Sequence, residues 1–262
     1  MSIEIANVTK IYDAGSSDPV RALENVTTTV QPRQLVTLLG PSGCGKTTLL
    51  DIVAGLTEQT SGEVRMPGAL NADASARPGI VFQNPVLLPW RTVLANVLLP
   101  AELGGSSAPI RRLRKDIESQ ARDLLALVNL EKFADKLPHQ LSGGMQQRVA
   151  IARALLLHRQ VLLMDEPFSA LDEFTREHMN LELLRIREER GLTVLFVTHN
   201  VFEAVFLSDR VLVMTPRPGA IVADITIDLP KNRNPDLIGS ESFGMEVKRV
   251  RNALDAYWKA TA

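Results

Sequence analysis

The sequence predicts an α/β fold in which a mostly helical segment interrupts the alternation of strands and helices. Residues 36–50 contain an apolar strand, a glycine-rich turn and the start of a helix in direct succession. The apolar runs 161–164 and 192–198 have the composition of buried parallel strands. Before them, residues 111–130 carry apolar residues at three- and four-residue spacing, which is typical of an amphipathic helix.

Two strands are predicted at the start of the chain. Ile3 and Ile5 alternate with polar residues, and every residue from 26 to 30 is β-branched. Tyr12 comes near the end of the first strand, where an aromatic residue is more often part of the core, although a purine also needs a flat apolar surface to stack on. Periodicity alone favours the core position for Tyr12.

The glycine-rich turn has the spacing of a phosphate-binding loop. Gly40 to Thr47 match the pattern G-x-x-x-x-G-K-[ST], in which backbone N–H groups surround phosphates, the lysine neutralises charge and the hydroxyl reaches Mg²⁺. The helix that follows points its positive end at the anion. The single cysteine, Cys44, lies in this turn and has no partner for an internal disulfide, so we interpret it as a small filler residue.

A helix, a turn and a short strand are predicted after the loop. The apolar residues of a buried helix are Leu49, Leu50, Ile52, Val53 and Leu56. Residues 60–62 form a turn that leads to residues 63–66, and the strand 79–83 ends in Gln83. A glutamine there is usually a cap or a surface group, but open α/β sheets place their ligands at that edge.

Residues 85–90 are predicted to form a loop, because they place bulky apolar residues between two prolines. Leu88 and Trp90 of this loop either fold onto the core or contact a partner. Residues 104–107 are the clearest flexible connector, and the amphipathic helix that follows begins with a basic face exposed to solvent.

The helical segment leads to a second turn of small residues, within 141–148. Ser142 is placed to cap the helix that follows. Like the phosphate loop, this turn precedes a helix N-terminus and is therefore suited to an anion. The alternative is a capped helix with tight packing at its glycines, and spacing alone does not decide between the two.

Acidic and histidine side chains end two of the predicted buried strands. Asp165 and Glu166 follow one strand, and His199 follows the other. Because parallel strands place their carboxyl ends at one edge of the sheet, these side chains point to the edge where phosphates are expected. There Asp165 is placed to hold Mg²⁺ through water, Glu166 to orient or deprotonate a water molecule, and His199 to sense a γ-phosphate.

The last part of the chain is predicted to form two strands and a short helix. The strands are 211–214 and 221–227, joined by a turn at 215–219. The terminal helix packs back on the body through Val247, Val250, Leu254 and Trp258.

Composition and charge exclude some classes of protein. Of the 262 residues, 45% are hydrophobic and 23% are charged, and the formal net charge is −1. This balance is ordinary for a globular protein and gives no reason to expect a nucleic-acid partner. No apolar run is long enough to cross a bilayer, and the first residues lack the pattern of a signal peptide, so we expect the chain to stay in the cytosol.

Taken together, these motifs resemble the ATP-binding subunit of an ABC transporter over nearly the whole chain. The most specific match is the run Leu141-Ser142-Gly143-Gly144-Met145-Gln146-Gln147-Arg148, which looks like the signature motif of this family. In family terms residues 40–48 are the Walker A loop, 161–166 the Walker B strand and 169–172 the D-loop. Gln83 corresponds to the Q-loop and His199 to the switch histidine.

The resemblance implies a phosphate-loop ATPase core with a mixed sheet, an N-terminal antiparallel β subdomain and a helical subdomain insert. The core and the β subdomain would comprise residues 1–88 and 157–228, the helical subdomain residues 89–156, and a C-terminal extension residues 229–262.

It also implies which residues act on ATP and Mg²⁺. Tyr12 matches the aromatic residue that stacks on adenine, which overturns its assignment to the core. The implied catalytic residues are Glu166, His199 and Lys46, the last of which would hold the β- and γ-phosphates. Mg²⁺ would be held by Thr47, Gln83 and, through water, Asp165. The implied ATP-binding residues are Tyr12, Gly40, Pro41, Ser42, Gly43, Cys44, Gly45, Lys46, Thr47, Thr48, Gln83, Asp165 and His199.

In this family two subunits meet head to tail, and each ATP lies between the phosphate loop of one and the signature motif of the other. The partner would be a second copy of the chain or a paralogue, and hydrolysis would require closure of the dimer. The residues implied to contact the partner's ATP are Ser142, Gly143, Gly144, Gln147 and Asp172. Asn200 departs from the family, which usually has an acid after the switch histidine, and this bears on how His199 is oriented.

Residues 82–93, 165–172 and 216–219 are similar to importers of the nitrate, sulfonate, taurine and bicarbonate group. The implied partners are transmembrane permease subunits and, indirectly, a periplasmic binding protein that delivers a small oxyanion or sulfonate. Leu87, Leu88 and Trp90 would contact the permease at the cytoplasmic face of the inner membrane, where the chain would be peripheral. The alternatives are an ABC ATPase of another importer or an exporter, and a soluble ABC-type nucleotide switch.

Overall fold

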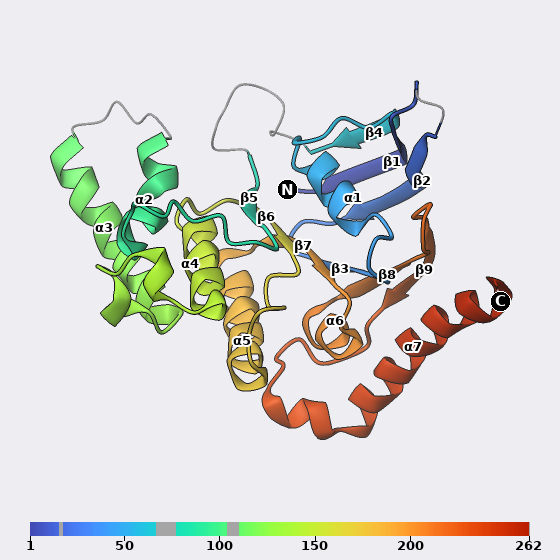
Figure 1. Cartoon of the computed structure of the whole chain (residues 1–262). Coiled ribbons are helices and arrows are strands. Elements are labelled where there is room, and N and C mark those ends of the chain that lie inside the picture. Colours follow the sequence, from blue (N-terminus) through green and yellow to red (C-terminus); the bar gives the residue numbers. More distant parts are fainter. Residues whose placement is uncertain (16–17, 67–76, 104–109, 262) are drawn as a thin grey trace.

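A six-stranded sheet runs through the centre of the protein (Figure 1). Its strands lie in the order β5-β6-β7-β3-β8-β9, and the first five are parallel while β9 is antiparallel to β8. Their bounds are Gly79–Val81 for β5, Val161–Asp165 for β6, Thr193–Thr198 for β7, Leu35–Leu39 for β3, Arg210–Met214 for β8 and Ile221–Thr226 for β9. The sheet is therefore mixed, as predicted.

This computed structural model describes residues 1–15, 18–66, 77–103 and 110–261. The connector predicted at residues 104–107 lies outside these ranges.

The N-terminal strands form a second, antiparallel sheet of three strands in the order β2-β1-β4. Their bounds are Ile3–Tyr12 for β1, Val20–Val30 for β2 and Ser61–Arg65 for β4. Figure 1 shows this sheet above the central one, with helix α1 (Lys46–Val53) beside it. Leu56 was predicted to belong to the buried helix, but it follows the end of α1 and is 56% exposed.

Alternate residues of the central strands face two different hydrophobic cores, as the period of two in a strand requires. Val36 and Leu38 of β3 pack in the core shared with α1 and the N-terminal sheet. Leu35 and Leu39 of the same strand pack in the core shared with the helices of the opposite face. Because both faces are covered, β3 and β6 are buried throughout and consist mostly of apolar residues.

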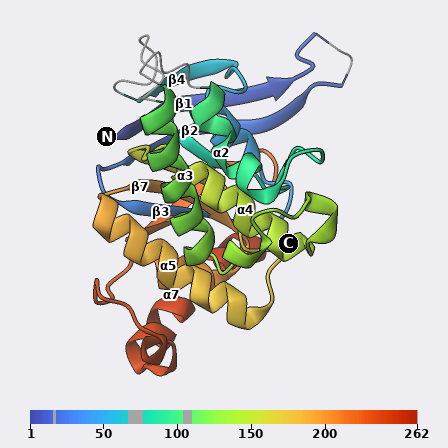
Figure 2. The same ribbon diagram turned by 90° about the vertical axis from the view of Figure 1, so that its left-hand side faces the viewer.

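Three helices gather beyond the β5 edge of the sheet (Figures 1 and 2). They are α2 (Val93–Leu103), α3 (Ile110–Leu127) and α4 (Gly143–Leu155), and they contact one another. The short 3₁₀ helices η2 (Glu131–Phe133) and η3 (Pro138–Gln140) connect α3 to α4. The α/β alternation is thus interrupted by a helical segment, as predicted.

The remaining helices are α5 (Glu173–Arg190), α6 (Val201–Leu207), the 3₁₀ helix η4 (Pro235–Gly239) and α7 (Glu241–Thr261). The terminal helix has 21 residues and is not the short helix that the sequence predicted. Val247 and Val250 are buried as expected. The side chain of Trp258 is not among those that the structure describes. No helix within the described residues has both the length and the apolar character needed to cross a membrane.

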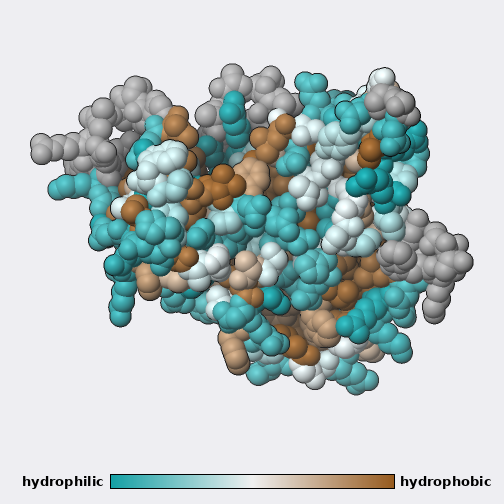
Figure 3. Space-filling view, in the orientation of Figure 1, coloured by the Kyte–Doolittle hydropathy of each residue, from teal (hydrophilic) through white to brown (hydrophobic). Residues whose placement is uncertain are grey.

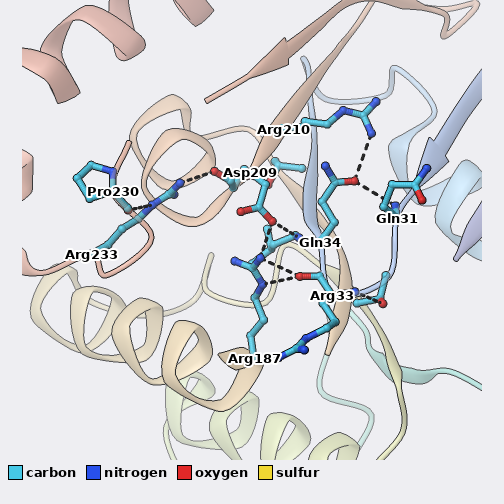
Figure 4. A network of polar contacts seen from close by, with 12 residues as sticks. Gln31, Arg33, Gln34, Arg187, Asp209, Arg210, Pro230 and Arg233 are labelled. Carbon is cyan, nitrogen blue, oxygen red and sulfur yellow. Dashed lines mark hydrogen bonds and ion pairs between the residues drawn. The ribbon is translucent and has the colours of Figure 1, made fainter. Parts of the chain in front are cut away.

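A polar network connects the amino ends of the parallel strands β3 and β8 (Figure 4). The Asp209 carboxylate, just before β8, accepts a hydrogen bond from the backbone N–H of Leu35 at 2.8 Å and pairs with Arg187 of α5 at 2.5 Å. Arg187 also donates to the backbone carbonyl of Arg33 at 2.9 Å. One acidic side chain therefore joins the ends of β3, α5 and β8, at the edge opposite to the phosphate loop.

Candidate functional site

The phosphate loop follows β3 and leads directly into α1. Gly45 is the N-cap residue of α1 and has φ of 98°. A Cβ at this position would lie 2.8 Å from the carbonyl oxygen of Ala22 and 2.7 Å from the Leu23 side chain. Only glycine fits both this backbone angle and this close approach.

Lys46 bridges the loop from within. Its Nζ donates to the backbone carbonyls of Gly40 and Pro41, both at 2.8 Å, and the residue is 5% exposed. Cys44 is fully buried in the core below the loop, which agrees with its interpretation as a filler residue. The ammonium group is thus held at the loop by two carbonyl groups, which phosphate oxygens are able to replace as partners.

Asp165 ends β6 beside the phosphate loop. Its Oδ2 accepts a hydrogen bond from the Thr47 hydroxyl at 2.8 Å, while its Oδ1 is buried and has no hydrogen-bond partner among the described residues. Burial raises the pKa of the Asp165 carboxyl, which the Thr47 hydrogen bond partly offsets. A buried carboxylate oxygen without a partner, next to a hydroxyl, fits a site for Mg²⁺, which prefers oxygen ligands.

Glu166 and His199 meet at the same edge. Glu166 Oε2 lies 3.1 Å from His199 Nδ1, and the Glu166 backbone N–H donates to the carbonyl of Val197 in the neighbouring strand at 3.0 Å. The Glu166 side chain is largely buried, whereas that of His199 is 58% exposed. The parallel pairing of β6 with β7 therefore brings together two residues that are 33 positions apart.

A cavity of about 290 Å³ joins the predicted residues of the loop and the sheet edge. It is lined by Tyr12, Val20, Ala22, Ser42, Gly43, Gly45, Lys46, Thr47, Thr48, Gln83, Glu166, His199 and Arg217. Tyr12 is 38% exposed in its wall, with Lys10 Nζ 4.8 Å from the ring centroid, so periodicity was a poor guide to its place.

Arg217 is a lining residue that the sequence analysis did not select. It belongs to the turn after β8, and Gly219 of that turn approaches the loop so closely that a Cβ would lie 2.0 Å from the carbonyl oxygen of Cys44. Gly219 N–H also donates to the carbonyl of Ala22 at 2.9 Å. The run from Pro216 to Gly219 predicted a turn, but it did not indicate which residues lie next to that turn in the fold.

The second small-residue turn caps α4. Ser142 Oγ accepts a hydrogen bond from Met145 N–H at 3.3 Å. At Gly144 a Cβ would lie 3.1 Å from the carbonyl oxygen of Ala170, whereas at Gly143 it would meet no atom of the described part of the chain within 4 Å. Of the described residues that line the cavity, none belongs to 142–148.

Gln147 does not lie where the family resemblance implied. It is 1% exposed, and its Nε2 donates to the backbone carbonyl of Phe82 at 2.9 Å, next to Gln83. A side chain buried inside its own subunit does not reach a partner's nucleotide in this conformation, so the structure gives Gln147 a role in holding the residues around Gln83.

Two other polar residues cap helices. Asp172 accepts hydrogen bonds from Thr175 N–H at 3.0 Å and from its hydroxyl at 2.7 Å, and these bonds lower the pKa of the Asp172 carboxyl. Asn200 is the N-cap of α6 and accepts from the N–H groups of Phe202 and Glu203. An asparagine oxygen performs this capping as well as an acid does, and His199 still contacts Glu166.

The loop after Gln83 exposes part of its apolar surface. Trp90 is 73% and Val86 64% exposed, while Leu88 is half-buried and Leu87 packs against the core. Figure 3 shows hydrophobic residues at the surface between β5 and α2. Leu87 therefore contributes to the packing of this subunit. Of the residues predicted to contact a membrane subunit, Trp90 is the most exposed.

The comparisons with known proteins agree with this geometry. A family model described as "ABC transporter" matches residues 23–169. An uncharacterized ABC transporter ATP-binding protein of Methanocaldococcus jannaschii is 47% identical over 234 residues, which cover 89% of this chain and 85% of that protein. The taurine import ATP-binding protein of Pseudomonas entomophila is 43% identical over 226 residues, with 86% and 84% covered. An aliphatic sulfonates import ATP-binding protein of Bacillus cereus is 40% identical over 250 residues, with 95% and 94% covered.

Two solved structures of one ABC transporter cassette have the same fold. Both align with a TM-score of 0.77, at 35% and 34% identity, and cover 87% of this chain and 100% of theirs. One is described as a dimer of a bacterial cassette, and the other as a dimeric post-hydrolysis state bound to ADP and Pi.

Proposed function

The chain belongs to the ABC transporter family and is an ABC-type ATPase, and we propose that it powers the import of a small anion by ATP-driven closure of a dimer. Its permease partners would hold it at the cytoplasmic face of the membrane. The proposed division of the chain is that of the sequence analysis, with core residues 1–88 and 157–228, a helical subdomain at 89–156 and a C-terminal extension at 229–262.

The observation that carries this proposal is the lining of the cavity, from which we infer that the chain supplies half of a nucleotide site. The cavity contains the phosphate loop, Tyr12, Glu166 and His199, but none of its described lining residues comes from the Ser142 turn. At Gly143 in that turn, the residues that the structure describes leave open space where a side chain would stand. A second subunit, placed head to tail, would bring Ser142 and Gly143 to the open side of the cavity and enclose the ATP.

Within the half-site, each side chain has a separate task. Tyr12 would stack on adenine, and Lys46 would exchange its two carbonyl partners for phosphate oxygens. Glu166 would take a proton from the attacking water as it adds to the γ-phosphorus, with ADP as the leaving group. His199, positioned by its contact with Glu166, would donate a hydrogen bond from Nε2 to the γ-phosphate when its ring is protonated.

Mg²⁺ would be held by Thr47, Gln83 and, through water, Asp165. When bound, the ion neutralises charge on the phosphates and lowers the barrier to their transfer. The Thr47 hydroxyl, which bonds to Asp165 in the structure, would turn to offer its oxygen to the metal.

The exposed loop after Gln83 is the proposed contact with the permease. Asn96 and Arg153 hold it in place: Asn96 bonds to Leu88 in both directions, at 2.8 and 3.1 Å, and Arg153 donates to the carbonyls of Pro85 and Val86 at 2.8 Å. A loop fixed at both ends with Trp90 exposed is suited to transmit movement from α4 to a membrane subunit.

The transported solute is proposed from the relatives. The relatives that are named for a solute include proteins named for taurine, aliphatic sulfonates, bicarbonate and nitrate. A small sulfonate or related oxyanion, delivered by a binding protein, is therefore the proposed cargo, which this subunit would not itself contact.

Dimer closure is tested by sedimentation of Glu166→Gln with and without ATP. ATP should convert this variant from monomer to dimer, because binding persists while hydrolysis stops. Adding Ser142→Arg should abolish the dimer, whereas Ser61→Arg, at an exposed serine of β4, should leave it intact. A monomer with ATP, or a dimer that tolerates Ser142→Arg, would contradict the shared site.

Transport is tested in vesicles that contain the chain with the permease that co-purifies with it. We expect ATP-dependent uptake of taurine or an alkanesulfonate, with nitrate and bicarbonate as the other candidates, and loss of permease binding in Trp90→Ala. Recovery of the chain without any hydrophobic subunit would favour the soluble switch. ATP-dependent efflux would favour an exporter.

A further inference from the structure

Helix α6 starts immediately after the residues that carry His199. It has only seven residues, from Val201 to Leu207. A helix of this length is not stable alone in water, because its nucleation cost exceeds the few hydrogen bonds it makes. Contacts from other parts of the chain must therefore hold α6 in place, and they also restrain the segment that precedes it.

The first turn of α6 is bonded to both neighbours of His199. Asn200 Oδ1 accepts from Phe202 N–H at 2.9 Å and from Glu203 N–H at 3.3 Å. On the other side, the Thr198 hydroxyl donates to the Glu203 carboxylate and accepts from Asn200 N–H at 3.1 Å. Thr198 and Glu203 are both buried. The backbone that presents His199 thus moves with the start of α6.

The end of α6 is held by Arg233, which comes from the C-terminal segment. Its guanidinium donates to the carbonyls of Val205 at 3.0 Å and of Phe206, and to that of Ser208 at 2.7 Å. Figure 4 shows it between Pro230 and the chain at Asp209. These are carbonyl groups that a helix end leaves without partners, and a cation there is also favoured by the helix dipole. Burial lowers the pKa of Arg233 to about 10, so the group is charged at neutral pH.

Phe243 of α7 supports α6 from the side. It is 1% exposed, and its ring centroid lies 6.4 Å from that of Phe206 and 6.1 Å from that of Phe202. The C-terminal segment therefore contacts α6 by hydrogen bonds at its end and by aromatic packing along its face.

We propose that Arg233 is a positioning residue for His199: the C-terminal segment fixes the end of α6 through its guanidinium, and α6 fixes the backbone on both sides of the histidine. The role of His199 towards ATP rests on the proposed function, but the contacts from Arg233 to His199 do not. In this scheme the C-terminal segment sets the orientation of His199 without contacting nucleotide. Anything that displaced the segment would release the histidine.

The test is the ring of His199 itself, observed by NMR in protein labelled with ¹³C at histidine. The chain has four histidines, and His199→Gln identifies the signal of interest. In Arg233→Gln the His199 signal should shift or broaden, while those of His139 and His158 stay in place. Arg249→Gln is the matched control, since Arg249 in the same segment donates to the carbonyl of Thr226 and not to α6. It should leave the His199 signal unchanged.

Kinetics separate positioning from general support of the fold. Arg233→Gln should lower kcat about tenfold, with KM for ATP within about twofold, because the effect is on a group that acts in the transition state. Arg233→Lys should recover part of kcat, since the ammonium retains charge and reaches fewer carbonyls. Phe243→Leu offers an independent disturbance of α6 if Arg233→Gln does not fold.

A His199 signal that stays in place in the folded Arg233→Gln and Phe243→Leu variants would overturn the inference. So would an equal shift of all four histidine signals, which would indicate a general change of the fold. The NMR result does not depend on import or on hydrolysis, so a failure of the proposed function is distinguishable from a failure of this proposal.

Discussion

His199 Nδ1 lies 3.1 Å from Glu166 Oε2, where the ends of β7 and β6 meet. With Glu166 ionised, this contact requires the proton of the imidazole to be on Nδ1, because a carboxylate only accepts. Nε2 is then an acceptor in the neutral ring and becomes a donor only when the ring is protonated. The pair therefore links the residue that is proposed to act on water to the one that is proposed to contact the γ-phosphate.

Replacing Glu166 by glutamine tests the proposed action of Glu166 on water. Glu166→Gln should retain ATP binding, because the phosphate loop and Tyr12 are untouched, and should lower kcat by about 10²- to 10⁴-fold through loss of the base. Steady-state phosphate release and equilibrium binding of labelled ATP measure the two quantities. Glu173→Gln, at an exposed acid of α5, is the control. Turnover at the parent's rate would remove Glu166 from its proposed role.

Tyr12 is expected to contribute to ATP affinity by stacking. Tyr12→Ala should weaken ATP binding by about tenfold, since loss of an aromatic platform for a base costs roughly 1–3 kcal/mol. Tyr12→Phe should bind ATP as the parent does, because the ring is retained. Titration with a fluorescent ATP analogue measures both. Equal loss in the two variants would point to the hydroxyl and contradict stacking.

The local motifs were predictable from sequence because their geometry is local. The loop from Gly40 to Thr47 carries its own glycines, strand and helix, and strand ends placed Asp165 and His199 at one edge once the strands were parallel. For Tyr12, which lines the cavity, periodicity favoured a place in the core, and only the family resemblance predicted a place beside the nucleotide.

Residues whose place depends on distant partners were not predictable in this way. Gln147 was expected to face a partner subunit, yet it is buried against Phe82, 65 positions earlier in the chain. Arg217 reaches the cavity only because Gly219 lies against the phosphate loop. Leu56 matched the apolar spacing of α1, but the helix ends at Val53. The spacing of apolar residues along the chain predicts which of them lie on the same face of a helix or strand. It does not predict which other segment packs against that face.

Glu203 predicts a pH dependence of stability. Burial raises the pKa of its carboxyl, and the Thr198 hydrogen bond offsets this only in part. Such a group contributes stability that is present below its unfolded pKa, near 4.5, and is lost as pH rises through its folded pKa. Glu203→Gln removes this titration and keeps an acceptor for Thr198. The free energy of unfolding of the variant, relative to the parent, should therefore rise between pH 4.5 and pH 7.

Urea unfolding at several pH values measures the Glu203 effect. Glu177→Gln is the matched control, because Glu177 is an exposed acid of α5, and its difference from the parent should vary little over the same range. If the difference between Glu203→Gln and the parent were also constant with pH, the carboxyl would not be titrating under the influence of burial.

Asn96 is expected to be the main support of the loop that carries Trp90. It is fully buried, and its amide donates to the carbonyls of Leu88, Arg91 and Thr92 at 3.0 to 3.1 Å while its oxygen accepts from Leu88 N–H at 2.8 Å. Asn96→Ala leaves these backbone groups without partners and should cost about 2–4 kcal/mol of unfolding free energy.

Asn96→Asp sharpens the Asn96 prediction. It keeps the acceptor for Leu88 N–H, loses all three donated bonds and places a carboxyl in a buried site, so it should be at least as destabilising as Asn96→Ala. Asn252→Ala, at an exposed asparagine of α7, should cost less than about 0.5 kcal/mol. Chemical denaturation of the three variants gives the order, and a stable Asn96→Asp would show that the donated bonds do not support the loop.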